Sequence, residues 1–177
     1  MDFLRAVSRS IDTLNERVGR GVRYGTLVMV LVTVVDVLMR YLFKAGSVGI
    51  QELEWHLFGV VFLLGAAYTL LHDEHVRVDI FYARMSVRGK ARVDLFGALF
   101  FCIPLCILVI ATSWSFVISS WQFWEGSPDP GGLPARYLLK TAVPVGFLLV
   151  ALQGLSMAAS SLRVLMGEEE DGGKGEG

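Results

Sequence analysis

The chain has 177 residues, 54% of them hydrophobic, and a formal net charge of -1. This length fits a single domain, and the near-neutral charge argues against a nucleic-acid partner. Three long segments, residues 55–71, 95–124 and 141–162, carry no Asp, Glu, Lys or Arg. Because a helix needs about 20 apolar residues to cross a bilayer, these segments exclude an ordinary soluble domain and predict an all-α integral membrane protein.

Residues 1–20 read MDFLRAVSRSIDTLNERVGR, with apolar residues recurring every three or four positions and charged residues between them. This spacing is typical of an amphipathic helix. We predict an interfacial helix on the cytoplasmic side, with its arginines near the anionic headgroups of membrane lipids. The alternative is a coiled-coil helix that binds a partner, which fewer than three heptads disfavour.

The first predicted span, residues 24–43, contains one acidic residue, Asp36. A carboxylate at the bilayer centre costs about 2.5–3.5 kcal/mol on insertion scales, so its presence needs a reason. Arg40 follows four residues later on the same helical face and can pair with it. An ion or proton site and a polar contact with another subunit remain open as alternatives.

The second predicted span, residues 55–71, is followed by HDEHVRVDIFYARMS at residues 72–86. His72 and His75 could share a helical face and bind a metal together with Asp73 or Glu74. However, the segment lacks the HExxH order, and no cysteine or further histidine lies nearby to complete a site. We therefore predict a loop connecting two helices and no metal centre.

The third and fourth predicted spans are residues 95–120 and 138–162, which gives a four-helix transmembrane domain over residues 21–166. Cys102 and Cys106 share a helical face inside the third span, where we expect them to pack rather than react. The tryptophans at the end of this span, Trp114, Trp121 and Trp124, indicate the outer headgroup boundary. Turn-forming residues then predict an external loop, and the acidic tail, residues 167–177, is predicted to be disordered.

Basic residues indicate the orientation of the chain. The N-terminal segment, the connection between the second and third spans and the C-terminal tail hold 12 of the 16 basic residues. The other side has only four, which are Arg40, Lys44, Arg136 and Lys140. Because basic residues stay cytoplasmic, we predict that both termini and the central connection face the cytoplasm.

The three histidines argue against a haem-binding anchor. His56 lies at the outer end of the second span, whereas His72 and His75 lie at or beyond its inner end. They cannot face one another across a haem. We expect no cofactor and no catalytic site.

Four segments of the chain carry a resemblance to a known family. They are DVLMRYLFKA, QELEWHLFGVVFLLGAAYTL, HVRVDIFYARMS and SPDPGGLPARYLLKTAVPVGFLLVALQGLS. In order and spacing they resemble the small membrane subunit, of DctQ type, of tripartite ATP-independent periplasmic (TRAP) transporters. The resemblance covers roughly residues 24–160.

The resemblance implies a small permease subunit in the bacterial inner membrane. Its expected partners are a large polytopic subunit of DctM type, which moves organic acids together with sodium, and a periplasmic substrate-binding protein of DctP type. The small subunit is expected to act as a scaffold for the large one. Two alternatives remain: an autonomous proton-coupled four-helix transporter that uses Asp36, and a membrane anchor for a redox enzyme.

The resemblance also indicates candidate residues. Asp36 and Arg40 match the family's acid–base pair at the end of the first span. Further candidates for contacts with another subunit or with lipid are Glu52, Glu54, Trp55, His75, Arg77 and Asp79. For the two glutamates, ordinary charge near a helix start is the alternative. For the residues of the HVRVD segment, stabilisation of the loop is equally open.

Overall fold

The computed structural model describes residues 2–72, 82 and 84–167, without the side chains of residues 2 and 3. Its elements in chain order are α1 (Asp2–Leu42), α2 (Val48–Leu71), α4 (Val87–Gly97), the π-helical turn η1 (Ala98–Cys102), α5 (Ile103–Gln122) and α6 (Arg136–Leu165). Four helical segments are long and apolar enough to cross a membrane, and the described residues contain no strand. The predicted all-α membrane fold with four spans is confirmed.

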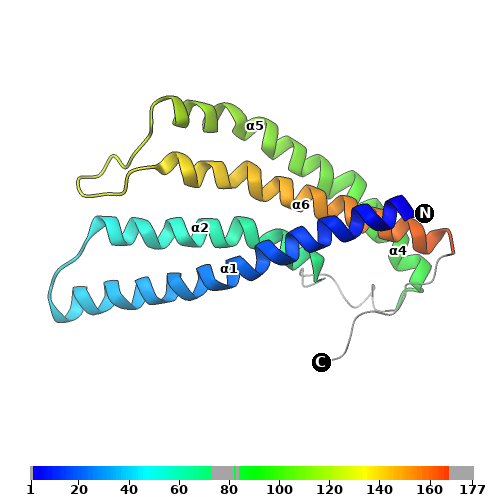
Figure 1. Cartoon of the computed structure of the whole chain (residues 1–177), viewed down its shortest axis with the longest axis horizontal. Coiled ribbons are helices and arrows are strands. Elements are labelled where there is room, and N and C mark those ends of the chain that lie inside the picture. Colours follow the sequence, from blue (N-terminus) through cyan, green and yellow to red (C-terminus); the bar gives the residue numbers. More distant parts are fainter. Residues whose placement is uncertain (1, 73–81, 83, 168–177) are drawn as a thin grey trace.

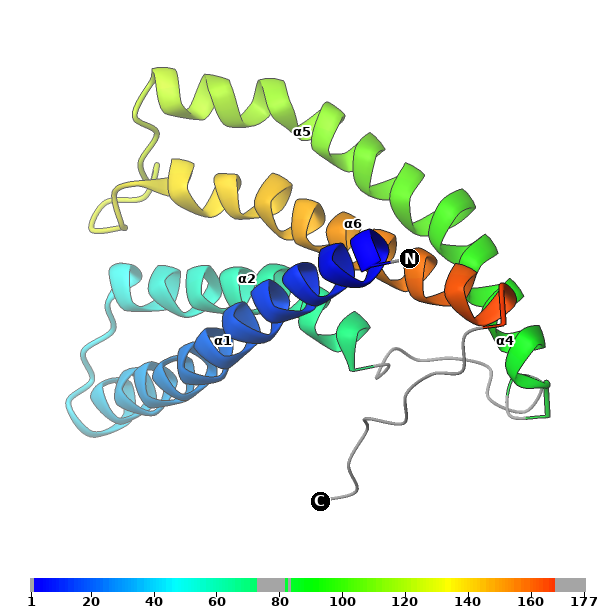
Figure 2. The same cartoon turned by 45° about the vertical axis from the view of Figure 1, so that its right-hand side comes forward.

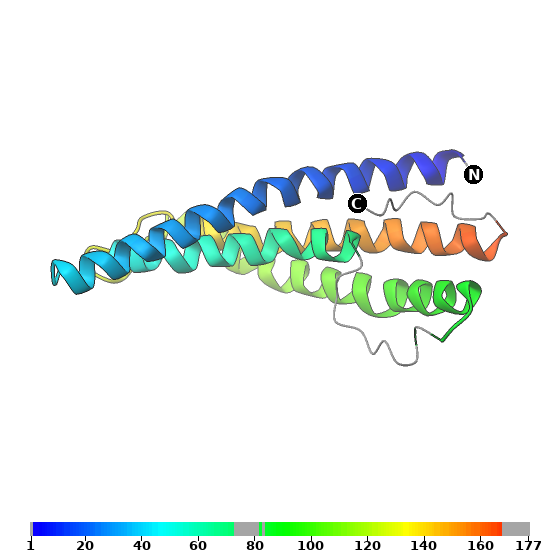
Figure 3. The same ribbon diagram turned by 90° about the horizontal axis from the view of Figure 1, so that it is seen from below.

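The spans form two antiparallel hairpins, α1–α2 and α5–α6, whose connections lie at the same end of the bundle (Figure 1). Helix α6 lies between α2 and α5 and also contacts α1 and α4. Figure 3 shows the N-terminal half of α1 running beside the C-terminal half of α6. Helix α6 also has the largest share of buried residues among the four spans. It is therefore the central helix of the bundle.

Small side chains let α6 approach its neighbours closely. Its buried residues include several with small side chains, namely Ala142, Gly146, Gly154, Ser156 and Ala158. A Cβ atom on Gly146 would lie 2.6 Å from the backbone oxygen of Leu63, so α2 and α6 touch backbone to backbone at this point. Helix pairs in membranes commonly associate through small residues, because close packing replaces the hydrophobic driving force.

Helix α1 differs from the expectation of a separate helix over residues 1–20. It continues for 41 residues, with no break at position 20. The amphipathic half packs on α6: Asn15 Nδ2 donates to Gln153 Oε1 at 2.7 Å, and Gln153 Nε2 donates to Asp12 Oδ1 at 3.0 Å. These bonds and the burial of Ile11 and Asn15 hold this half in line with the first span. A position of this half in the lipid interface stays a prediction.

The third span is built from three successive pieces. Ser86 caps α4, because its Oγ accepts the Gly89 N–H at 3.2 Å, so the helix begins eight residues before the predicted start at Leu95. The π-helical turn η1 then precedes Pro104, which lies in the first turn of α5. A proline lacks the N–H for a helical bond, and π-turns and prolines are common causes of helix bending. The predicted tail lies almost wholly outside the described residues, which end at Gly167.

Candidate functional site

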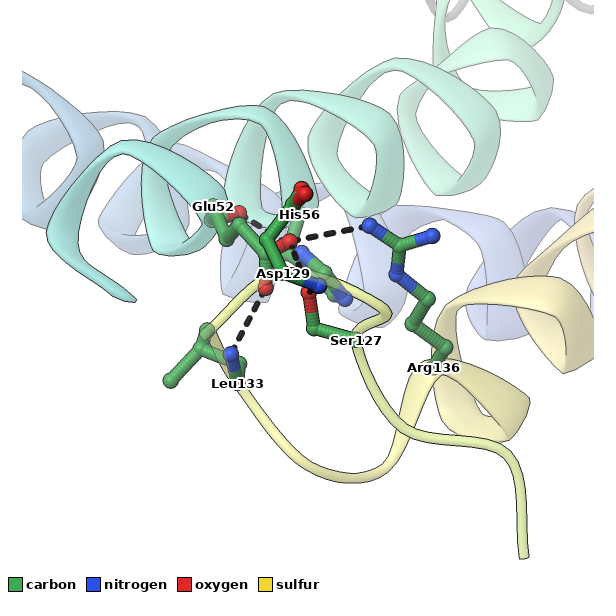
Figure 4. A network of polar contacts seen from close by, with 6 residues as sticks. All are labelled: Glu52, His56, Ser127, Asp129, Leu133 and Arg136. Atoms are coloured by element: carbon green, nitrogen blue, oxygen red, sulfur yellow. Dashed lines mark hydrogen bonds and ion pairs between the residues drawn. The ribbon is translucent and has the colours of Figure 1, made fainter. Parts of the chain in front are cut away.

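A cluster of polar contacts surrounds Glu52, in the first turns of α2 (Figure 4). Glu52 is 4% exposed, and its carboxylate accepts three hydrogen bonds. The donors are Ser127 Oγ at 2.5 Å, the Leu133 N–H at 2.6 Å and Arg136 Nη2 at 2.9 Å. We call these four residues the Glu52 cluster. It joins α2 to the external loop, residues 123–135, and to the start of α6.

The backbone around the cluster leaves no room for larger residues. A Cβ atom on Gly132 would lie 2.3 Å from Ser127 Oγ and 2.8 Å from Glu52 Oε2. A Cβ atom on Gly49 would lie 3.0 Å from the backbone oxygen of Gly131. Glycine at positions 49 and 132 therefore lets the loop lie directly against the start of α2.

Arg136 links the cluster to Trp55. Its guanidinium carbon lies 5.4 Å from the centroid of the Trp55 ring, within the range of a cation–π interaction. One turn along α2, His56 Nδ1 lies 2.6 Å from the backbone oxygen of Glu52. Because that oxygen can only accept, the proton must be on Nδ1. Glu52 and Trp55, two of the predicted candidates, thus share one arginine, whereas Glu54 makes no hydrogen bond through its buried Oε1.

A second ion pair lies beside the first at the same end of the bundle. Lys140 Nζ donates to Glu125 Oε2 and lies 3.9 Å from the centroid of the Phe116 ring. The hydrogen bond from Lys140 is the main cause that holds the pKa of Glu125 below its ordinary value. In addition, Trp121 Nε1 donates to Thr141 Oγ1 at 2.8 Å, so α5 and α6 are joined by polar contacts at their ends.

Asp36 is 2% exposed, and Arg40 Nη2 donates to its Oδ2. The two residues pair within α1, as their spacing of four predicts. The other carboxylate oxygen, Oδ1, has no hydrogen-bond partner among the described residues. The role of this pair beyond the contact itself stays a prediction.

The remaining candidates lie in the central connection. His75, Arg77 and Asp79 are outside the described residues, as are Asp73 and Glu74 of the possible metal site. His72 is described, and its Nε2 lies 2.9 Å from Glu16 Oε2 of α1. Within residues 2–72, 82 and 84–167, no three His, Cys, Asp or Glu side chains are grouped as metal ligands would be.

Sequence reasoning missed the partners of Glu52. Ser127, Leu133 and Arg136 lie 75 to 84 positions further along the chain. The turn-forming residues correctly placed a loop there, but nothing in their pattern indicates which helix the loop contacts. It also missed Asp12 and Asn15, whose polar side chains face α6 from within the amphipathic helix.

The buried carboxylates described above are paired with basic residues of the same chain, and such contacts stabilise the fold. Glu52 and Asp36, the two buried carboxylates of the described residues, both face an arginine of the same chain. A carboxylate paired in this way is neither a free base nor a nucleophile. The Glu52 cluster connects α2, the external loop and α6 at one end of the bundle, whereas the other pair joins two residues of α1.

The sequence as a whole matches a described family. The family model for the DctQ component of tripartite ATP-independent periplasmic transporters matches residues 29–164, which includes all four spans from the middle of α1 to the end of α6. No curated protein matches the chain. Members of this family are transporter components rather than enzymes. The match covers well over half of the chain, and the chain therefore belongs to the DctQ family, as a multi-pass membrane component of a TRAP transporter.

Proposed function

We propose that this chain is the scaffold subunit of a sodium-coupled TRAP transporter for organic acids in the bacterial inner membrane. A large DctM-type subunit carries the substrate, and a periplasmic DctP-type protein delivers it. Both termini of the chain are cytoplasmic, so the Glu52 cluster lies on the periplasmic side. The family membership supports a place in such a complex.

The observation that favours a scaffold is that both buried acids of the described residues are paired with an arginine. A carrier of protons or sodium needs an acid that can change its ligand during transport, and acids at membrane depth are the usual marks of such a site. Here Asp36 is bound by Arg40 and Glu52 by Arg136. Apolar side chains cover the outward faces of the spans, which suits contact with lipid and with another membrane protein.

The test is reconstitution with and without the large subunit. The tagged chain is purified in mild detergent, and co-purifying proteins are identified by mass spectrometry. Liposomes then receive this chain alone, the large subunit alone, or both, with the binding protein and a sodium gradient. We expect co-purification of the large subunit and sodium-dependent uptake only with both. Uptake by this chain alone would refute the scaffold role.

The unpaired oxygen of Asp36 is the one observation that favours the autonomous proton-coupled transporter. Under that alternative, Asp36→Asn abolishes transport by the purified chain. Under the scaffold role, the same variant leaves the turnover of the assembled transporter within about twofold of wild type, because the residue never binds the transported ion. Measuring sodium-dependent uptake by the assembled complex distinguishes the two.

A further inference from the structure

An apolar groove runs beside the third span. Helix α2 and the third span both pack on α6, but they share no extensive contact with each other. The groove lies where these three parts approach one another, and its volume of about 980 Å³ is at the upper end of the range of about 300–1,000 Å³ that is typical of ligand sites. Apolar side chains from five helical elements line it, among them Leu70, Phe100, Phe101, Leu105 and Val150.

A polar pocket continues this groove at the end of the bundle opposite the Glu52 cluster. The pocket has a volume of about 450 Å³ and lies between the end of α2, the start of α4 and the last turns of α6. Four residues, Leu70, Tyr82, Asp94 and Met157, line both the pocket and the groove. The two spaces therefore form one cavity with a polar end and an apolar body, which we call the amphipathic cavity.

The polar end contains charges of both signs that are not paired with each other. Lys90 has no carboxylate within ion-pair distance among the described residues, and its Nζ lies 5.2 Å from the centroid of the Tyr82 ring. Asp12 Oδ1 accepts hydrogen bonds from α6, and Asp94 Oδ2 accepts the Tyr82 hydroxyl at 2.6 Å. In the described ranges neither acid contacts a basic group. One cation and two anions are thus available to a ligand.

Two serines of α6 add hydroxyl donors to this end. Ser161 is 7% exposed and lines the pocket, and its Oγ has no hydrogen-bond partner within the residues that the structure describes. A buried hydroxyl without a partner is unfavourable and indicates a missing ligand. Ser160 Oγ accepts Arg163 Nη2 at 2.9 Å, which leaves its own O–H free to donate. Both hydroxyls can therefore donate to an anionic oxygen.

We propose that the amphipathic cavity binds one molecule of phosphatidylethanolamine, with its acyl chains in the groove and its headgroup in the polar pocket. Lys90 and the hydroxyls of Ser160 and Ser161 donate to the phosphate. Asp12 and Asp94 accept from the ammonium group. The proposal goes beyond the scaffold role and requires only that the chain spans the membrane.

The mixture of charges decides which occupant fits. Basic pockets between transmembrane helices suit anionic headgroups, but here two carboxylates oppose a headgroup that is only negative. The trimethylammonium group of phosphatidylcholine has no N–H for these carboxylates, whereas a primary ammonium has three. A helix of another membrane protein would match the apolar groove but would leave the charges at its polar end without partners.

The experiment is native mass spectrometry of the full chain in mild detergent. The chain is titrated with phosphatidylethanolamine, phosphatidylglycerol and phosphatidylcholine that carry the same acyl chains, and the Kd of the first bound lipid is measured for each. The variants are Lys90→Gln, Asp94→Asn and Met157→Trp, the last of which fills the junction of pocket and groove. The matched controls are Arg88→Gln, on α4 outside the cavity lining, and Leu155→Trp, on an exposed face of α6.

We expect wild type to bind phosphatidylethanolamine about tenfold more tightly than phosphatidylglycerol, because the carboxylates attract the first headgroup and repel the second. Lys90→Gln should raise the Kd of all three lipids by about tenfold, since the phosphate is common to them. Asp94→Asn should reduce the preference for phosphatidylethanolamine over phosphatidylglycerol, an effect that a merely structural role would not produce. Met157→Trp should abolish binding, and both controls should bind as wild type.

Three results would overturn the proposal. One is equal or tighter binding of phosphatidylglycerol, and another is a Lys90→Gln variant with wild-type affinity. The third is lipid retained by Met157→Trp, which would place it elsewhere on the surface. Lys90 is only half-buried, so its variant remains informative even where Met157→Trp reduces the yield of folded chain. Loss of the lipid on addition of the large subunit would assign the cavity to that protein instead.

Discussion

Glu52 and Glu125 lie at the same end of the bundle and are both bound by basic residues of α6, but in different surroundings. Glu52 is almost completely buried and accepts bonds from two loop residues as well as from Arg136. Glu125 is partly exposed and depends mainly on Lys140. The Glu52 contacts therefore fix the conformation of the loop, whereas the Glu125–Lys140 ion pair is sensitive to pH and salt.

Removal of the Glu52 carboxylate is expected to release the external loop. In Glu52→Ala, the Leu133 N–H and Arg136 lose their acceptor, so the loop should be cleaved faster by a protease and the Tm should fall. Ser127→Ala removes only one of the three donors and should have a smaller effect in both measurements. Limited proteolysis with mass spectrometry of the fragments checks the site of cleavage. Equal cleavage of wild type and Glu52→Ala would contradict the assigned role.

The Glu125–Lys140 pair predicts a loss of stability in acid. The pKa of Glu125 is lowered from its ordinary value of 4.5, chiefly by the hydrogen bond from Lys140. The pair's contribution is therefore fully present above pH 4.5 and is lost as the pH falls through the lower pKa of the folded state. We expect Glu125→Gln to lower the Tm at pH 7, and this difference to shrink progressively below pH 4.5. A difference that stays constant down to pH 3 would contradict the pairing.

Whether a residue contact could be predicted depended on its distance along the chain. Asp36 and Arg40 are four apart, so helical geometry alone brings them together. The partners of Glu52 come from a loop that returns across the bundle, and their positions depend on how α5 and α6 pack. The burial of Asn15 against α6 could not be predicted either. An amphipathic pattern indicates the apolar face of a helix, but not which polar residues form hydrogen bonds with a neighbouring helix.

At the scale of the helices, hydropathy predicted where the four spans lie but not how far each helix extends. Helix α1 continues through both the amphipathic half and the first span, because contacts with Gln153 support it beyond the apolar part. The helix that contains the third span begins at Val87, before the predicted span, because Ser86 caps the helix within a charged segment. An apolar run shows where lipid is crossed, whereas a cap and tertiary contacts decide where a helix ends.

Two glycines of the helices are expected to respond in opposite ways to substitution by alanine. Gly146→Ala places a Cβ atom 2.6 Å from the backbone oxygen of Leu63 and should force α2 and α6 apart, at a cost of about 1–3 kcal/mol. In Gly21→Ala the added Cβ atom has no neighbour within 4 Å, so this variant should stabilise α1 by up to about 1 kcal/mol through the higher helix propensity of alanine. Thermal unfolding of both variants in detergent checks the prediction. A Gly146→Ala variant as stable as wild type would mean that the helices are not in close contact.

At the scale of the whole molecule, α6 is the helix against which all the others pack. It contacts α1, α2, α4 and α5, while α1 and α5 lie on opposite sides of it (Figure 2). Both hairpin connections lie at one end of the bundle, and the arginine-rich start of α1 lies at the other. The orientation that the basic residues predict therefore places the external loop and the N-terminus on different sides of the membrane.

Cysteine labelling tests this orientation. In a background with Cys102→Ser and Cys106→Ser, single cysteines are introduced by Ser47→Cys, Asp129→Cys and Ser10→Cys. An impermeant maleimide added to intact cells should label positions 47 and 129 but not position 10, which should react only after the membrane is opened. Labelling of position 10 in intact cells would reverse the proposed topology and remove the external loop from the periplasm.

The π-helical turn at residues 98–102 lets the third span tolerate a change in chain length. Such a turn contains one residue more than the α-helix around it requires. Deleting that residue would give a regular helix of nearly the same height, with α4 and α5 in nearly the same relative rotation, because the wider turn accommodates the extra residue locally. Tyr82, which donates to Asp94 Oδ2 at 2.6 Å, would then meet the same face of the helix. Homologous chains that are one residue shorter in this region can therefore keep that contact with a regular α-helix in place of the turn.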